Sequence, residues 1–274
     1  MLRKDLKRGA PAAAGTADPA EIRRFNALAD EWWKPEGAFK VVHAFNRARV
    51  AHLSERLPLL LGRDPKASRP LAGLKIIDVG CGAGLVAEPI SRLGAEVIGI
   101  DASERNVAVA ERHARASGAS AQYRHALPEE CGHLAGTFDA ALSLEVVEHV
   151  ADLPAFLEAL ARLVTPGGIL VIGTLNRTLL SFLKAILGAE YVLRWLPRGT
   201  HDWRKFVTPE ELELALIRHA FTVVERCGVS LRIPSLRWVI DSDLTASYLQ
   251  FHRKQKSRVA SSAREELGRR AIDP

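Results

Sequence analysis

The chain has few cysteines and no long apolar run. Its 274 residues include three cysteines, which are far apart and form no C-x-x-C pair. This usage indicates a reducing compartment and argues against a zinc site. No apolar stretch approaches the roughly 20 residues that cross a bilayer, and residues 1–8 lack the apolar core of a secretory signal. We therefore expect a cytoplasmic protein without a membrane span.

Strong charge is also missing from the body of the chain. The net charge is +6, but residues 1–8 carry +3 and residues 253–274 carry +4, so the rest sums to about −1. A basic surface for nucleic acid is therefore not indicated, and we expect no nucleic-acid partner. Residues 1–17 and 253–274 are expected to be disordered basic tails, either solvated or near anionic lipid.

Three glycines at alternate positions follow a short apolar run. The run Leu74–Val79, which contains Asp78, has the length and β-branched content of a buried strand. Gly80, Gly82 and Gly84 allow a sharp turn and a close approach of ligand to backbone. The helix expected next directs free N–H groups to the same place. The pattern indicates a nucleotide-cofactor site, with an ordinary tight turn as the alternative.

A second acid follows the next predicted strand, residues 95–100. Asp101 stands where a carboxylate can accept hydrogen bonds from both hydroxyls of a ribose. The spacing D-x-G-x-G-x-G differs from the G-x-G-x-x-G of dinucleotide-binding proteins, which argues against a dehydrogenase. Together the two stretches resemble motifs I and II of the class I S-adenosylmethionine-dependent methyltransferases. The resemblance implies S-adenosylmethionine as the cofactor.

Strand and helix patterns alternate through the middle of the chain. Strands are expected at 74–79, 95–100, 120–125, 138–144 and 169–175, and helices at 84–93, 103–117 and 152–163. The alternation predicts an α/β fold, with a Rossmann-like, seven-stranded and mostly parallel sheet that has helices on both faces. Strands near 221–229 and 243–251 would close the sheet as an antiparallel hairpin.

Two additions to the sheet are expected within a single domain of residues 18–252. Residues 18–70 should form a helical cap over the cofactor edge, beginning at Asp18-Pro19. Residues 176–206 form an apolar insertion after the fifth strand. A lid, or an amphipathic helix on a membrane surface through residues 178–196, is the favoured interpretation, and an ordinary helical pair in the core is the alternative.

Ionisable residues cluster directly after the fourth strand. Glu145, Glu148 and His149 would share one face if this segment were helical. A phenol keeps its proton up to a pH of about 10, so these groups could act as a general base or hold a divalent cation such as Mg²⁺. The alternative is that their hydrogen bonds only fix the loop. The Asn/Asp-Pro-Pro-Tyr stretch of methyltransferases that act on nucleic-acid amino groups is absent.

Several further stretches resemble the ubiquinone-biosynthesis O-methyltransferases over roughly residues 18–252. They are Trp32-Trp33, Glu36-Gly37, Phe39-Lys40, His43, Asn46, Arg49, Asp78–Gly82, Glu145, Glu148–Val150, Thr174–Arg177, Gly188–Tyr191 and Gly199–Asp202. Many members have glycine where Ala83 stands. The combination is more specific than the cofactor motif alone.

The resemblance implies methylation of phenolic or catechol hydroxyls of polyprenylated ubiquinone precursors, including 3-demethylubiquinol to ubiquinol. It implies that Arg49 contacts the cofactor carboxylate, and that Gly80, Asp101 and Leu144 contact other parts of the cofactor. It also implies peripheral association with the inner (cytoplasmic) membrane and raises the prospect of a ubiquinone-biosynthesis complex. Two other hypotheses remain open: a different lipophilic acceptor, and a non-catalytic scaffold that retains the fold.

Overall fold

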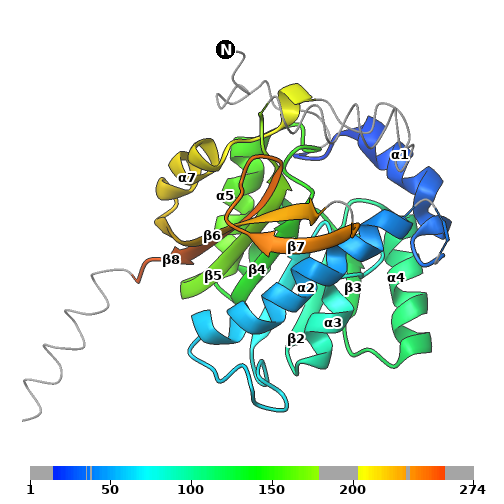
Figure 1. Ribbon diagram of the computed structural model, residues 1–274, viewed down its shortest axis with the longest axis horizontal. Coiled ribbons are helices and arrows are strands. Elements are labelled where there is room, and N and C mark those ends of the chain that lie inside the picture. Colours follow the sequence, from blue (N-terminus) through cyan, green and yellow to red (C-terminus); the bar gives the residue numbers. More distant parts are fainter. Residues whose placement is uncertain (1–14, 35, 38, 179–202, 233–234, 257–274) are drawn as a thin grey trace, which may run out of the picture.

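The computed structural model describes residues 15–256 except 35, 38, 179–202 and 233–234 (Figure 1). Its centre is an eight-stranded sheet in the order β3-β2-β1-β4-β5-β8-β6-β7. The strands are β1 (Lys75–Val79), β2 (Glu96–Asp101), β3 (Gln122–His125), β4 (Phe138–Leu144), β5 (Val164–Leu175), β6 (Phe221–Arg232), β7 (Arg237–Asp241) and β8 (Ser247–Lys254). The first five pair in parallel, and the last three join antiparallel. The predicted α/β fold class is confirmed.

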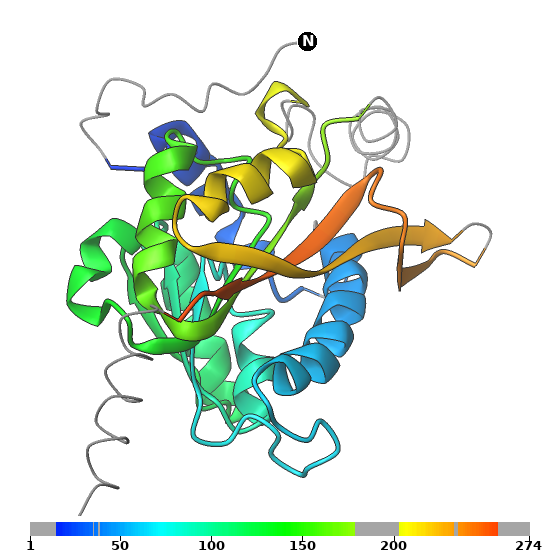
Figure 2. The same cartoon turned by 90° about the vertical axis from the view of Figure 1, so that its left-hand side faces the viewer.

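Helices cover both faces of this sheet. They are α1 (Pro19–Leu28), α2 (Lys40–Leu60), α3 (Ala87–Arg92), α4 (Glu104–Ser117), α5 (Leu153–Leu163) and α7 (Pro209–Ile217), with 3₁₀ turns η1 (Ala29–Glu31), η2 (Pro128–Leu134) and η4 (Trp203–Lys205). Ile76 of β1 packs in a core with α2, α3 and α4, whereas its neighbour Ile77 packs with α5 and α7. Successive strand side chains point to opposite faces, so β1 is buried on both. Figure 2 shows α2, in blue, across the sheet from α5 and α7.

Local capping explains where two of the helices begin. The Asp18 carboxylate accepts a hydrogen bond from the Ala20 amide at 2.9 Å, and Pro19 occupies the first helical turn of α1. The Ser103 hydroxyl accepts from the Asn106 amide at 3.0 Å and caps α4. Both caps satisfy amides that have no partner within the helix. The helix starts predicted from these residues are confirmed.

The sheet has one more strand than expected. Arg237–Asp241 adds β7 at the sheet edge, where it pairs with β6 alone. Its five residues, R-W-V-I-D, lie at intermediate burial or exposed, and their apolar part is the short run W-V-I. A short edge strand is held mainly by its neighbour's backbone, so the sequence carries little signal for it.

Two expected boundaries and one conditional expectation differ in the structure. Residues 145–149 form a turn, with Glu145 at a φ of 59°, so the helix that would have placed Glu145, Glu148 and His149 on one face is not formed. Thr16, placed in the disordered tail, is buried, and its amide donates to Glu129 Oε1 at 2.6 Å. Strand β8 extends to Lys254, whose ammonium donates to the carbonyls of Ala161 and Val164, both at 2.8 Å. Tertiary hydrogen bonds decide all three, and local patterns do not report them.

The lid or membrane-surface helix expected for the apolar insertion lies mainly outside the described residues. Most of the predicted membrane contact at 178–196 falls there, as do the resembling stretches 188–191 and 199–202. Within the part of the chain that is described, no helix is long and apolar enough to cross a membrane.

Acid should destabilise the fold through His252. This residue is fully buried in β8, and its Nε2 lies 3.2 Å from Gln250 Oε1. Burial, with a smaller contribution from Arg226, lowers the pKa of His252 from 6.5 to about 3. The unfolded chain therefore binds the extra proton between these values, so stability is present above pH 6.5 and falls as the pH drops below it.

We expect the unfolding free energy of the wild type to fall by roughly 1 kcal/mol more than that of His252→Gln between pH 6 and pH 5. Urea denaturation at each pH measures this difference. Parallel pH profiles for the two proteins would contradict the role of His252.

Candidate active site

A cavity of about 630 Å³ opens at the carboxyl ends of β1, β2 and β4. Ligands of open α/β sheets bind at this edge, where the strand order reverses direction. Most of the lining residues are apolar, and they come from the N-terminal helices, from the strand ends and from the β6–β7 hairpin. The cavity is therefore a suitable place for both a cofactor and an apolar acceptor.

The glycine turn after β1 is packed too tightly for side chains. Gly80 has a φ of +74°, and a Cβ there would lie 2.4 Å from Val146 Cγ2. Gly84 has a φ of +87°, and a Cβ would lie 2.3 Å from the hydroxyl of Tyr123. Gly80 and Gly82 line the cavity, whereas Gly84 does not. Gly84 thus packs against Tyr123 and shapes the turn, and it does not face the cavity.

Asp101 joins the glycine turn to the end of β2. Its Oδ2 accepts from the Gly82 amide at 2.9 Å, and its Oδ1 accepts from the Ser103 amide at 2.8 Å and from Asn106 Nδ2 at 3.3 Å. Burial raises the pKa of Asp101, and these donors oppose the rise. A carboxylate has about four acceptor sites, so capacity remains for a donor in the cavity. This position fits the predicted ribose contact.

Asp78 is a site residue whose role the sequence did not predict. Its carboxyl group is buried and lines the cavity, and its Oδ2 has no hydrogen-bond partner among the described residues. Burial and, to a smaller extent, nearby Asp101 together raise the pKa of Asp78 to about 7, while Arg49 opposes the rise. The sequence did contain a signal for this role: Asp78 is an acid within an apolar strand, close to the glycine turn. Burying a carboxylate there costs stability, so a function is the simplest reason for its presence.

Arg49 brings a positive charge to the same place from α2. It is 2% exposed, its Nη1 lies 2.7 Å from Glu145 Oε1, and its Nε donates to Asn46 Oδ1 at 3.1 Å. Burial lowers the pKa of Arg49, while Glu145 and Glu148 raise it. Arg49, Glu145 and the last residue of β4, Leu144, all line the cavity. The structure therefore gathers the predicted cofactor residues around one space, with Gly84 just beneath it.

The proposed metal ligands do not converge. Glu145 pairs with Arg49, Glu148 Oε2 accepts from the Thr174 hydroxyl at 2.8 Å, and His149 Nδ1 lies 3.1 Å from Glu21 Oε2. The turn at 145–149 directs the three side chains to different neighbours, because no shared helical face exists. The other oxygen of Glu148 is buried without a hydrogen-bond partner among the described residues.

No group of three or more His, Cys, Asp or Glu side chains within the described ranges is arranged to hold a metal ion. Arg49 supplies the positive charge that offsets Glu145 and Glu148. The residues as arranged do not fit a divalent cation, and the metal site stays a prediction without geometric support. Of the three residues predicted to be catalytic, Glu145 and His149 line the cavity and Glu148 does not.

His149 is held against the N-terminal cap. Its ring meets Phe25 edge-on, with centroids 5.4 Å apart, and its Nδ1 faces the Glu21 carboxylate. The hydrogen bond with His149 lowers the pKa of Glu21. A carboxylate that faces one ring nitrogen fixes the orientation and the tautomer of an imidazole. Neither Glu21 nor Phe25 was singled out in the sequence, because their proximity to His149 depends on how the cap folds.

Removal of the Arg49 charge should destabilise the protein. We expect Arg49→Gln to lower the unfolding free energy by about 3 kcal/mol, since it leaves Glu145 and Glu148 without their buried cation. A matched exposed pair, Arg105–Asp30 at 2.7 Å, provides the control: Arg105→Gln should cost less than about 1 kcal/mol. Urea denaturation near neutral pH measures both, and equal losses would contradict the assignment.

Comparison with known proteins agrees with this geometry. Residues 45–226 match a family model described as a methyltransferase domain. In the magnesium protoporphyrin IX methyltransferase of Synechocystis PCC 6803, solved with bound SAH, the fold is similar, with a TM-score of 0.60 at 21% identity over 87% of this chain and 100% of that one. This structural similarity confirms the predicted fold.

Sequence similarity is much higher to curated relatives. The ubiquinone biosynthesis O-methyltransferase of Mesorhizobium japonicum is 47% identical over 234 residues, which cover 85% of this chain and 94% of the relative. The protein of that name from Agrobacterium fabrum is 43% identical over 242 residues, which cover 88% and 97%. The chain therefore belongs to the ubiquinone biosynthesis O-methyltransferase family, and the prediction of an O-methyltransferase enzyme is confirmed.

Proposed function

We propose that the chain transfers the methyl group of S-adenosylmethionine to phenolic or catechol hydroxyls of polyprenylated ubiquinone precursors, including 3-demethylubiquinol to ubiquinol. The observation that carries the proposal is one apolar cavity that holds Asp78, Asp101 and Arg49 at the strand ends. The names of relatives that are 43–47% identical support the choice of acceptor.

The charges around the cavity match the charges of this cofactor. In this proposal Asp101 accepts from the ribose hydroxyls and Arg49 contacts the cofactor carboxylate, as the family resemblance implies. Asp78 offers a buried oxygen without a partner among the described residues to the cationic part of the cofactor. A nearby cation lowers the pKa of a carboxylic acid, so a bound cofactor would keep Asp78 ionised. Gly80 and Leu144 complete the wall.

His149 is the general base that the geometry favours. The cofactor supplies an activated methyl group, and the acceptor hydroxyl must lose its proton as its oxygen attacks that group. The imidazole of His149 lines the cavity and is oriented by Glu21 at 3.1 Å. The proton would pass from the hydroxyl to His149, and Glu21 would stabilise the charge that forms. Glu145 acts by holding Arg49 in place.

An aromatic wall suits the ring of the acceptor. Trp238 of β7 and Phe45 of α2 both line the cavity, with ring centroids 4.8 Å apart in an edge-on arrangement. The Arg49 guanidinium lies 4.0 Å above the Phe45 ring and fixes its orientation. Exclusion of water by such a wall favours in-line transfer. The extra strand β7 therefore contributes Trp238 to the acceptor side of the cavity.

Peripheral membrane association is part of the same proposal. It rests on the apolar composition of residues 178–196 and on the isoprenoid tail of the acceptor, which partitions into a bilayer. The ends of the insertion meet beside the core, since Trp203 Nε1 donates to the Thr178 carbonyl at 2.9 Å. Membership of a ubiquinone-biosynthesis complex stays a prediction.

The direct test supplies the purified chain with S-adenosylmethionine and a short-chain 3-demethylubiquinol. Mass spectrometry should show a methylated product that needs both the enzyme and the cofactor. A protein that binds the cofactor but methylates only other lipophilic phenols would favour the alternative acceptor. A protein that binds no cofactor in calorimetry would favour the scaffold hypothesis.

Two substitutions should separate the cofactor side from the acceptor side. Asp101→Ala removes hydrogen bonds to a charged group, and we expect it to raise the KM for S-adenosylmethionine by about 10- to 100-fold, with little change for the acceptor. Trp238→Ala should raise the acceptor KM by about tenfold and leave the cofactor KM unchanged.

Val224→Ala, at an exposed position of β6 outside the cavity, is the control. It should alter neither KM. A Trp238→Ala variant that changes the cofactor KM alone would contradict the assigned acceptor wall.

A further inference from the structure

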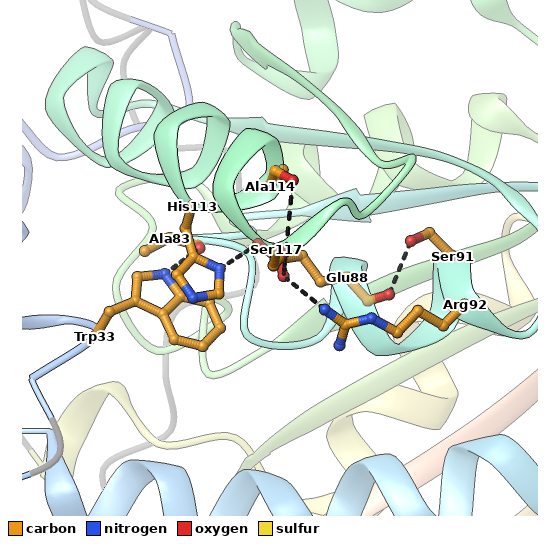
Figure 3. Close-up of polar contacts among 8 residues, drawn as sticks. All are labelled: Trp33, Ala83, Glu88, Ser91, Arg92, His113, Ala114 and Ser117. Atoms are coloured by element: carbon orange, nitrogen blue, oxygen red, sulfur yellow. Dashed lines mark hydrogen bonds and ion pairs between the residues drawn. The ribbon is translucent and has the colours of Figure 1, made fainter.

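The second tryptophan of the N-terminal pair lies outside the cavity but contacts the glycine turn. Trp33 Nε1 donates to the carbonyl of Ala83 at 3.0 Å, and Ala83 is fully buried between Gly82 and Gly84. The indole of Trp33 also stacks on the imidazole of His113 in α4, with ring centroids 3.4 Å apart and planes within 1° (Figure 3). One side chain of the cap thus joins the cofactor turn to α4.

A buried carboxylate fixes His113 from the other side. Glu88 of α3 is 1% exposed, and its Oε1 lies 2.7 Å from His113 Nδ1. Its Oε2 accepts from the Ser117 hydroxyl at 2.9 Å and lies 3.5 Å from Arg92 Nη2 (Figure 3). A buried charge is tolerated only when it is paired and hydrogen-bonded. Glu88 therefore holds the His113 ring in the orientation that meets Trp33.

The first tryptophan and Asp101 also contact the turn. Trp32 lies over Gly82, where a Cβ would come within 3.2 Å of its ring. Its Nε1 donates to Asn106 Oδ1 at 3.0 Å, and Asn106 in turn donates to Asp101. Asp101 accepts from the Gly82 amide. Two chains of contacts, one through each tryptophan, thus meet at the adjacent residues Gly82 and Ala83.

We propose that Trp33, His113 and Glu88 form a latch that positions the glycine turn for the cofactor. None of the three lines the cavity, so they are positioning residues that act through the Ala83 carbonyl. The inference rests on the proposed function, because the ligand of the turn is S-adenosylmethionine there. The latch makes cofactor affinity and residence time depend on whether the N-terminal cap is docked.

The latch should affect the cofactor and not the acceptor. Trp33 and His113 lie outside the cavity and reach the turn through the Ala83 carbonyl, whereas the aromatic wall of Phe45 and Trp238 lines the cavity itself. A loosened Ala83 carbonyl lets Gly82 and its bond to Asp101 shift. The cofactor would then bind more weakly and leave sooner, while the wall that receives the acceptor keeps its shape.

Two conservative substitutions test the latch in the full-length chain. Trp33→Phe keeps a smaller stacking ring and removes the N–H donor. His113→Gln keeps a donor for Glu88 and removes the stacked ring. We expect each to raise the Kd for S-adenosylhomocysteine by about fivefold in calorimetry, the size of one lost hydrogen bond for Trp33→Phe and of one lost aromatic contact for His113→Gln. Each should also speed the dissociation of this ligand in stopped-flow fluorescence.

Steady-state kinetics and a double variant distinguish a specific effect on the glycine turn from a general loss of stability. The KM for S-adenosylmethionine should rise while the acceptor KM stays unchanged. The combined Trp33→Phe/His113→Gln variant should raise the Kd by less than the product of the single effects, because both residues act through one contact.

Trp203→Phe is the matched control, since it removes another indole N–H to carbonyl bond, at 2.9 Å, away from the glycine turn. It should leave the Kd unchanged. Wild-type affinity in both single variants, with or without a lower melting temperature, would overturn the latch, as would an equal loss in Trp203→Phe. Failure of the wild type to bind S-adenosylhomocysteine would instead contradict the proposed function.

Discussion

Close packing around the glycine turn after β1 is the constraint on which the rest of the site depends. A side chain at Gly80 would collide with Val146, and one at Gly84 would collide with Tyr123. Because neither position has space, the turn brings the ends of β1, β2 and β4 within reach of one ligand. Asp101 joins the turn to β2 through the Gly82 amide. This packing holds the three strand ends in place, and the cavity lies between them and the elements that cover them.

Charge balance inside this packed region is the second requirement. Asp78, Asp101 and Glu148 are removed from water to different degrees, and Arg49 is the buried cation that faces two acids, Glu145 and Glu148. Asp78 keeps a raised pKa because the cation does not fully offset its burial and its neighbour Asp101. A cofactor that carries positive charge would complete the balance. The buried negative charge that Arg49 does not offset therefore both raises the pKa of Asp78 and favours a cationic ligand.

Local sequence patterns predicted much of the fold. Strand β4 begins and ends where the apolar run Phe138–Leu144 does, and α4 begins after its Ser103 cap. Such elements follow from burial on both faces or from capping, which involve neighbouring residues. Strand β7 and the turn at Glu145 depend on distant partners, so the sequence did not predict the strand and left the conformation at Glu145 open. Thr16 is likewise held by a distant partner, because its amide and hydroxyl both donate to Glu129.

The sequence by itself determined the fold class, the cofactor turn and the family, since spaced glycines, capped helices and short motifs act through local geometry. Tertiary structure alone decided how the polar groups are paired. It directed Glu145 to Arg49, Glu148 to Thr174 and His149 to Glu21, and so separated three residues that spacing had suggested as one ligand set. It also placed Trp33 on His113 across 80 residues of chain. Pairings over such distances depend on how whole elements pack, which no local pattern records.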